Sequence, residues 1–206
     1  MVPILKLDLK RKYRLLYNPS PREVSIVDVP LFNYLMIDGS GDPNNNAEYE
    51  QALDALYSAS YTLKFMLKKS EKPVDYSVMA LEGLWWIADG SLDLQDRTNW
   101  RWTMMIMQPE FINQKQINLA LEQAAQKKDI PALSRLRYES LHEGLAAQIM
   151  HIGPYATEAP TIAKLHGYIH ENGYHEHGKH HEIYLSDPRR ATPERLKTIL
   201  RHPVTQ

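Results

Sequence analysis

The chain has 206 residues, a formal net charge of −1 and no cysteine. This length suffices for a sizeable core, the balanced charge gives no reason to expect a nucleic-acid partner, and the lack of thiols excludes disulfides, thiolate catalysis and thiolate metal sites. The sequence shows neither a signal-peptide pattern in 1–16 nor an apolar run long enough to span a bilayer. We therefore expect a cytoplasmic protein with no membrane partner.

The first half of the chain has the order strand, helix, strand, strand. A strand pattern covers 24–38, is interrupted at Pro30 and is followed by a turn-forming segment. A helix is expected over about 47–69, because apolar residues recur there at intervals of three, four or seven. Strands at 76–87 and 100–108 follow, and the polar segment 89–96 between them predicts an exposed loop.

The second half repeats this order after a connecting helix at about 114–128. A strand at 144–152 precedes a helix at about 160–172, and the next strand carries Glu182. A threonine, proline and glutamate in succession then have the signature of a helix start. A last short helix is therefore expected over about 192–202.

These two halves predict an α+β fold. Strand-helix-strand-strand modules commonly pair edge to edge, so we expect two modules in pseudo-twofold arrangement that form one antiparallel sheet with a central ligand groove. The expected organisation is a single domain over 1–206, with a first module at about 22–110, a connector helix at about 112–130, a second module at about 138–188 and a C-terminal helix at about 192–202.

Two acidic residues stand inside strands that are otherwise aromatic or apolar. Alternation places Glu182 on the same strand face as Tyr184, and Glu82 on the same face as Trp86. A carboxylate in such a strand is expensive to bury unpaired. The two acids therefore suggest a cleft for a ligand that is flat, apolar or cationic.

Aromatic side chains gather near both acids. Four tryptophans fall on two adjacent strands, and each can either pack in the core or line a pocket. Indole and phenol rings near a carboxylate suit cations and polarised aromatic ligands. The candidate ligand-binding residues are Trp85, Trp86, Trp100, Trp102, Tyr168 and Tyr184.

A run of histidines is the alternative candidate for a functional site, namely a metal site. Its spacing matches no zinc motif, and the neighbours His180 and His181 point in opposite directions on a strand. A solvated histidine-rich loop is the preferred interpretation, no metal ligand is assigned, and no cofactor is expected. The pattern leaves open whether the segment 166–181 binds metal. Its histidines are His166, His170, His175, His177, His180 and His181.

Several longer motifs resemble the GyrI-like small-molecule-binding family, and in particular its stand-alone branch, which includes cyclopropanoid cyclopropyl hydrolases. The resemblance covers about 24–204. The motifs that carry it are Leu81-Glu82-Gly83-Leu84-Trp85-Trp86, Trp100-x-Trp102-Thr103, Gln108-Pro109-Glu110-Phe111, Gln148-x-x-His151-Ile152-Gly153-Pro154-Tyr155 and His180-His181-Glu182-Ile183-Tyr184-Leu185-Ser186-Asp187-Pro188.

This resemblance implies a groove for flat, often cationic, xenobiotics, with Glu182 at the position of the family's ligand-contacting carboxylate. The hydrolases of the branch open the spirocyclopropane of DNA-alkylating natural products of the yatakemycin type within an aromatic cage. A matching mechanism needs a base that activates water and a donor that protonates the dienone oxygen. The candidates are Trp86, Trp102 and Tyr184 for the cage, Glu182 or Glu82 for the base, and Tyr155 or His151 for the donor.

The alternative function is binding without chemistry, as a drug sensor or a sequestering protein. It needs the same aromatic residues and the same acid, so the sequence does not separate the two functions. In both cases the expected partner is a small molecule, and the oligomeric state is not readable from the sequence. A transcription factor is less favoured, because the charge is balanced and little chain precedes Val24.

Overall fold

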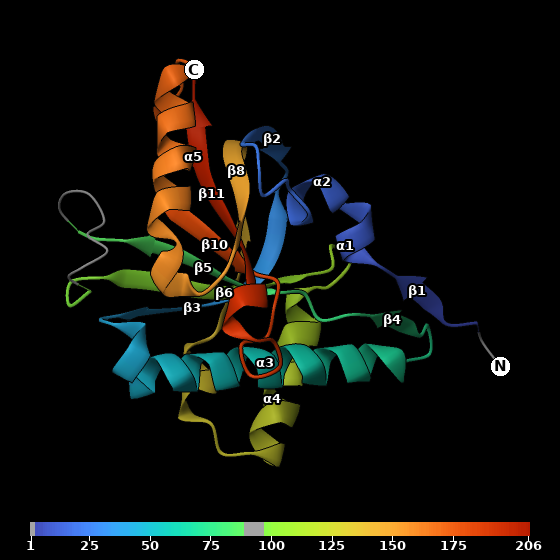
Figure 1. Cartoon of the computed structure of the whole chain (residues 1–206). Helices are drawn as coiled ribbons and strands as arrows, with labels where there is room; N and C mark the ends of the chain where they lie inside the picture. The colour runs from blue at the N-terminus through green and yellow to red at the C-terminus, as the bar shows by residue number, and fades with distance from the viewer. Residues whose placement is uncertain (1–2, 89–96) are drawn as a thin grey trace.

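Figure 1 shows the computed structural model of the chain, which describes residues 3–88 and 97–206. The loop expected at 89–96 lies outside the described residues. The elements follow in the order β1 (Leu5–Leu7), α1 (Leu9–Lys12), α2 (Arg14–Tyr17), β2 (Ser25–Val29), β3 (Phe32–Ser40), α3 (Ala47–Lys68), β4 (Val74–Tyr76), β5 (Leu81–Trp86), β6 (Arg101–Gln108), α4 (Gln114–Lys127), β7 (Arg137–Leu141), β8 (Gly144–Ile152), α5 (Ala159–Glu171), β9 (His175–Glu176), β10 (His180–Tyr184) and β11 (Lys197–Thr205).

The main sheet confirms the expected α+β architecture of two joined modules. Its strand order is β2-β8-β11-β10-β5-β6-β3-β7, with β9 added beside β11, and neighbouring strands are antiparallel. The first module is β3-α3-β5-β6 and the second is β8-α5-β10-β11. In space their strands run β3, β6, β5 and then β10, β11, β8, so the two modules are related by a pseudo-twofold at the β5–β10 pair.

The long helix α3 begins and packs as its sequence predicts. The Asn46 side chain accepts hydrogen bonds from the backbone of Glu48 and Tyr49, which satisfies two amides that the helix start leaves free. Ala55, Leu56 and other apolar residues at helical spacing form the buried stripe. The segment therefore presents one apolar face to the sheet and a polar face to solvent.

Helices α3 and α5 cover the same face of the sheet, which we call the helical face. Tyr49 of α3 packs edge-on against Trp102 of β6 at 5.2 Å between ring centroids. On the second module, Leu165 and Ile169 of α5 pack in one apolar cluster with Leu200 of β11. Figure 1 shows α5 running alongside β8 and β11, while α3 lies across the other module with α4 behind it.

The opposite face, which we call the N-terminal face, is covered in part by α1 and α2. Tyr17 of α2 donates a hydrogen bond of 2.8 Å to Glu82 of β5. Gln148 of β8 donates to the Leu15 carbonyl oxygen at 2.8 Å. None of the helices in the described parts of the chain is both long and apolar enough to cross a membrane.

The prediction of a helix over about 192–202 is wrong. Only the 3₁₀ turn Pro193–Arg195 forms there, and Lys197–Thr205 is a strand between β8 and β10. The proline and glutamate start one turn, but the following side chains alternate between the two faces, and Ile199 and Leu200 are both fully buried. A strand that is buried on both faces has a continuous run of apolar residues. Over so few residues, such a run cannot be distinguished from the apolar face of a helix.

Two other expected strands divide into shorter ones. The expected interruption of the segment 24–38 at Pro30 is confirmed, and its two parts diverge, because β2 pairs with β8 while β3 pairs with β6. Of the expected strand 76–87, Leu81–Trp86 forms β5 in the main sheet, whereas Tyr76 is the last residue of β4, which pairs with β1 in a small parallel sheet. The first strand pattern thus supplies an edge strand to the second module.

A buried ion network stabilises the N-terminal face. His181 lies 3.0 Å from Glu82 and 2.9 Å from Glu143, and Arg201 lies 3.1 Å from Glu143. Burial alone would lower the pKa of His181, but the charges of Glu143 and Glu82 outweigh it and raise that pKa to about 9. Burial alone would raise the pKa of Glu143, but His181 and Arg201 lower it to about 2. The network therefore holds opposite charges together out of water.

A pH titration of stability should report the charge on His181. The folded state retains this proton up to a pKa of about 9, while an unfolded histidine loses it near pH 6.5. Its contribution is complete below about pH 6.5 and is lost as the pH rises toward 9, by up to about 3 kcal/mol. We expect the free energy of unfolding, measured with urea, to fall over this range in the parent and much less in His181→Gln.

His177→Gln is the matched control, because His177 is exposed. It should retain the parental slope. Parallel pH curves for His181→Gln and the parent would contradict a charged histidine in the network.

Candidate functional site

The register of β5 against β10 separates the two candidate acids. Glu182 lies opposite Gly83, and Glu82 lies opposite Ile183, so the two carboxylates point to opposite faces of the sheet. The prediction of a single cleft lined by both acids is therefore wrong. Glu82 is fully buried in the ion network of the N-terminal face, where Tyr17 and Tyr34 also donate to it, whereas Glu182 lies on the helical face.

Glu182 belongs to a group of six residues that we call the interhelical cluster. The group lies on the helical face, where the starts of α3 and α5 meet β5 and β10. Its members are Tyr49, Trp85, Tyr155, Glu158, Glu182 and Tyr184.

A hydrogen-bonded chain fixes three of these side chains. Trp85 Nε1 donates to the Tyr184 hydroxyl at 3.1 Å, and that hydroxyl donates to Glu182 Oε2 at 2.7 Å. The indole reaches this position because it lies over Gly83, where a Cβ would be 2.8 Å from Nε1. The carboxylate is therefore held on one side by a tyrosine whose own orientation is fixed.

Two further tyrosines surround this chain. Tyr155, on the 3₁₀ turn before α5, meets Tyr184 edge-on at 5.8 Å between centroids. Tyr49 of α3 lies 6.3 Å from Trp85. Burial, Glu158 and Glu182 raise the pKa of Tyr155 to about 12, so its hydroxyl keeps its proton at neutral pH. The cluster thus offers aromatic surface and phenolic donors around one carboxylate.

Glu158 is the functional candidate that sequence reasoning missed. It precedes α5, is 6% exposed, and its Oε1 is buried with no hydrogen-bond partner in the described residues. Burial and the charge of Glu182 raise its pKa to about 9. A neutral carboxylic acid therefore stands beside a second acid. In the sequence, Glu158 is only an acidic residue just before a helix, and this pattern is typical of a solvated residue at a helix start.

The predicted tryptophans divide among three environments. Trp85 belongs to the cluster, and Trp100 packs edge-on against it at 5.3 Å, with the Arg97 guanidinium 4.9 Å from the Trp100 ring. Trp102 is fully buried below Tyr49, over Gly39, where a Cβ would be 2.1 Å from its ring. Trp86 lies on the opposite face from Trp85, with the Lys179 ammonium 3.3 Å from its ring centroid. Trp85 is therefore linked to Glu182 through Tyr184, Trp100 flanks Trp85, and Trp102 supports Tyr49.

The other predicted residues lie outside the cluster or support it. The ring nitrogens of His151 are engaged by Thr161 at 3.0 Å and by the Pro154 carbonyl oxygen at 3.3 Å, so this histidine anchors the start of α5. Tyr168 lines an open hollow between α5 and the segment 22–24. The expectation of a solvated histidine loop is wrong for His180 and His181, which are both buried.

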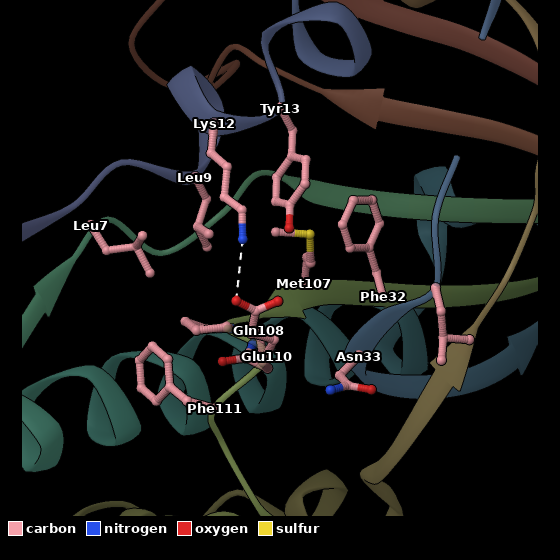
Figure 2. Close-up of a pocket in the computed structure, with 12 residues that line it drawn as sticks. Leu7, Leu9, Lys12, Tyr13, Phe32, Asn33, Met107, Gln108, Glu110 and Phe111 are labelled. Atoms are coloured by element: carbon pink, nitrogen blue, oxygen red, sulfur yellow. Dashed lines mark hydrogen bonds and ion pairs between the residues drawn. The ribbon is translucent and has the colours of Figure 1, made fainter. Parts of the chain in front are cut away.

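A second hollow lies near the N-terminal segment, as Figure 2 shows. Lys12 spans it to reach Glu110 at 3.2 Å, and Tyr13 and Met107 line its wall. Its cavity volume of about 40 Å³ is close to that of one water molecule. It is too small for a flat organic ligand and contains no member of the interhelical cluster.

Comparison with known proteins places this architecture in a family. Residues 22–204 match the GyrI-like small molecule binding domain. The chain belongs to the GyrI-like family. No curated protein gives a significant match to this GyrI-like chain.

Solved structures similar to this GyrI-like domain include two close ones from Listeria innocua. One is an uncharacterized conserved protein, 40% identical, with a TM-score of 0.89, and the alignment covers 97% of this chain and 100% of that one. The other is a hydrolase, also 40% identical, with a TM-score of 0.87 and the same coverage. The C-terminal domain of EcmrR, at 11% identity, TM-score 0.58 and coverage of 89% and 98%, shows the fold alone.

The coupling between the two acids of this GyrI-like domain is measurable. Because the charge of Glu182 helps to raise the pKa of Glu158, Glu182→Gln should lower that pKa. Titration of ¹³C-labelled glutamate side chains by NMR should show the Glu158 signal moving at a lower pH in the variant.

Glu194→Gln removes an exposed acid outside the cluster and should leave the Glu158 titration unchanged. A Glu158 signal that titrates like an ordinary glutamate in the parent would contradict the buried neutral acid.

Proposed function

We propose that the interhelical cluster binds flat apolar or cationic small molecules and hydrolyses strained spirocyclopropyl compounds of the DNA-alkylating type, which would detoxify them. The observation that carries this proposal is the adjacent pair of acids among aromatic rings, in which burial and the neighbouring Glu182 keep Glu158 neutral. Two carboxyl groups in environments that separate their protonation states commonly divide the roles of acid and base. The Listeria innocua hydrolase at 40% identity supports an enzymatic role.

The aromatic members supply the binding surface. Trp85, Tyr49 and Tyr155 present rings from three different elements around Glu182. A planar ligand can stack on such rings, and the carboxylate favours ligands that carry a positive charge. Tyr155 is 38% exposed, so the cluster reaches solvent at this residue.

Glu182 is the proposed base. Its carboxylate accepts a proton from a water molecule, and the water oxygen forms a bond to the unsubstituted cyclopropane carbon of the ligand. The carbon–carbon bond of the strained ring breaks, and its electron pair moves through the dienone to the carbonyl oxygen. Glu82 is less suited to this role, because an ion network holds it on the other face of the sheet.

Glu158 is the proposed proton donor. A neutral carboxylic acid with a pKa raised to about 9 can protonate the oxygen that becomes a phenol. Tyr155 can donate a hydrogen bond to the same oxygen as its negative charge develops. The net reaction adds one water molecule, and both carboxyl groups return to their starting states by exchange with solvent. His151 is less suited, because Thr161 and Pro154 engage its nitrogens.

Glu182→Gln tests the base. The amide keeps the size and hydrogen-bonding capacity of the side chain but does not accept the proton of water. We expect turnover of a spirocyclopropyl alkylator to fall by roughly 10²-fold or more, while ligand affinity from tryptophan fluorescence quenching stays within about tenfold. Glu171→Gln, at an exposed position on α5, is the control and should match the parent. Unchanged turnover in Glu182→Gln would exclude Glu182 as the base.

Sequestration without chemistry is the second candidate, because the family is defined by small-molecule binding. Mass spectrometry of the alkylator after incubation with a small fraction of an equivalent of protein separates the two functions. We expect complete conversion to a ring-opened product that has gained one water. Loss of free ligand that stops at one equivalent, without a product, would establish sequestration and contradict catalysis.

A further inference from the structure

Three histidines from three elements meet on the helical face, next to the interhelical cluster. His166 lies on α5, His180 on β10 and His202 on β11. One nitrogen of each ring lies within 4.8 Å of the other two. Figure 1 shows how α5 runs alongside β11, which brings these elements together.

Two of these rings are buried with an unsatisfied nitrogen. His180 and His202 are 6% and 8% exposed, and in the described residues His180 Nε2 and His202 Nδ1 have no hydrogen-bond partner. Buried polar groups in native proteins are nearly always paired. His180 Nε2 has only the Glu182 carboxylate nearby, at 3.4 Å, and His202 Nδ1 forms no hydrogen bond with the described residues, so the two buried nitrogens leave room for a partner that accepts lone pairs.

Glu176 on β9 supplies a carboxylate at the same place. Its side chain contacts His166, and its Oε2 lies 3.9 Å from His202 Nε2. His170, one turn after His166 on α5, lies 3.1 Å from Glu176 Oε1. Three imidazoles and one carboxylate thus converge from four different elements.

We propose that His166, His180, His202 and Glu176 bind one divalent transition-metal ion, and that zinc is the ion that fits best. Three nitrogens and one oxygen are a donor set that zinc accepts in tetrahedral geometry, whereas magnesium and calcium prefer oxygen alone. Zinc–nitrogen bonds of about 2.0–2.1 Å put neighbouring donors about 3.4 Å apart. The observed limit of 4.8 Å among the three histidine nitrogens therefore requires a contraction of about 1.4 Å, and Glu176, which is not within that limit of all three, would complete the set by a side-chain movement.

The ion would bind together parts of the second module that are distant in sequence. It would join α5 to β9, β10 and β11 through one side chain each. The site is also close to the interhelical cluster, because His180 Nε2 lies 3.4 Å from Glu182 Oε1. Metal binding would thus fix the strand that carries Glu182, beside that carboxylate.

Zinc alone is the probe for the test. Protein dialysed against a chelator is titrated with zinc in competition with a chromophoric chelator. We expect one equivalent to bind, with the dissociation constant raised at least about tenfold in His166→Ala. His166 and Glu176 are both partly exposed, so Glu176→Gln serves as a second variant if His166→Ala folds poorly.

Exposed histidines supply the control. His175→Ala/His177→Ala removes two exposed imidazoles that do not belong to the three-histidine group, and this double variant should retain the one equivalent. Zinc should raise the melting temperature of the parent and of the double variant, but not that of His166→Ala. Cobalt(II) in place of zinc should give the absorption bands of a tetrahedral site in the parent.

Absence of binding in the parent would overturn the proposal. So would binding that survives in both His166→Ala and Glu176→Gln, or binding that disappears only in His175→Ala/His177→Ala. Either pattern would assign the affinity to surface histidines. These readouts do not use catalytic turnover, so they are independent of the proposed hydrolase function.

Discussion

The pairing of β5 with β10 is the contact on which the rest of the structure depends, because it joins the two modules into one sheet. Its register sets Gly83 beside Glu182 and directs Glu82 to the other face. Gly83 also leaves room for the Trp85 indole to reach Tyr184. A shift by one residue would turn every β10 side chain to the opposite face. The site and the ion network are therefore consequences of one backbone alignment.

The acids on the two faces of the sheet differ in whether a positive charge lies beside them. Glu82 and Glu143 are buried beside His181, so their charges are compensated. Glu158 is buried beside another acid, Glu182, and is kept neutral instead. Breaking a compensated pair exposes a buried charge and mainly costs stability, whereas an uncompensated acid is a source of reactive protons. One sheet thus separates carboxylates whose charges are compensated from the pair to which we assign the proposed chemistry.

The sequence predicted what depends on local periodicity. Helices α3, α4 and α5 have clear apolar stripes, and the order of elements in each half was sufficient for the two-module architecture. The sequence did not predict how β5 and β10 align, so Glu82 and Glu182 could not be assigned to faces of the sheet in advance. Glu158 was missed because its burial comes from packing of distant segments. The strand at Lys197–Thr205 was missed because a short helix start precedes a run buried on both sides.

The position of β11 has a consequence for how the chain acquires its fold. This strand is late in sequence but lies between β8 and β10. Until the ribosome has delivered residues through Thr205, β8 and β10 have no common neighbour, and their backbone groups remain exposed as open edges. Such edges pair readily with other chains. The second module therefore cannot close before β11 has been synthesised, so truncation within β11 should promote aggregation rather than yield a smaller folded unit.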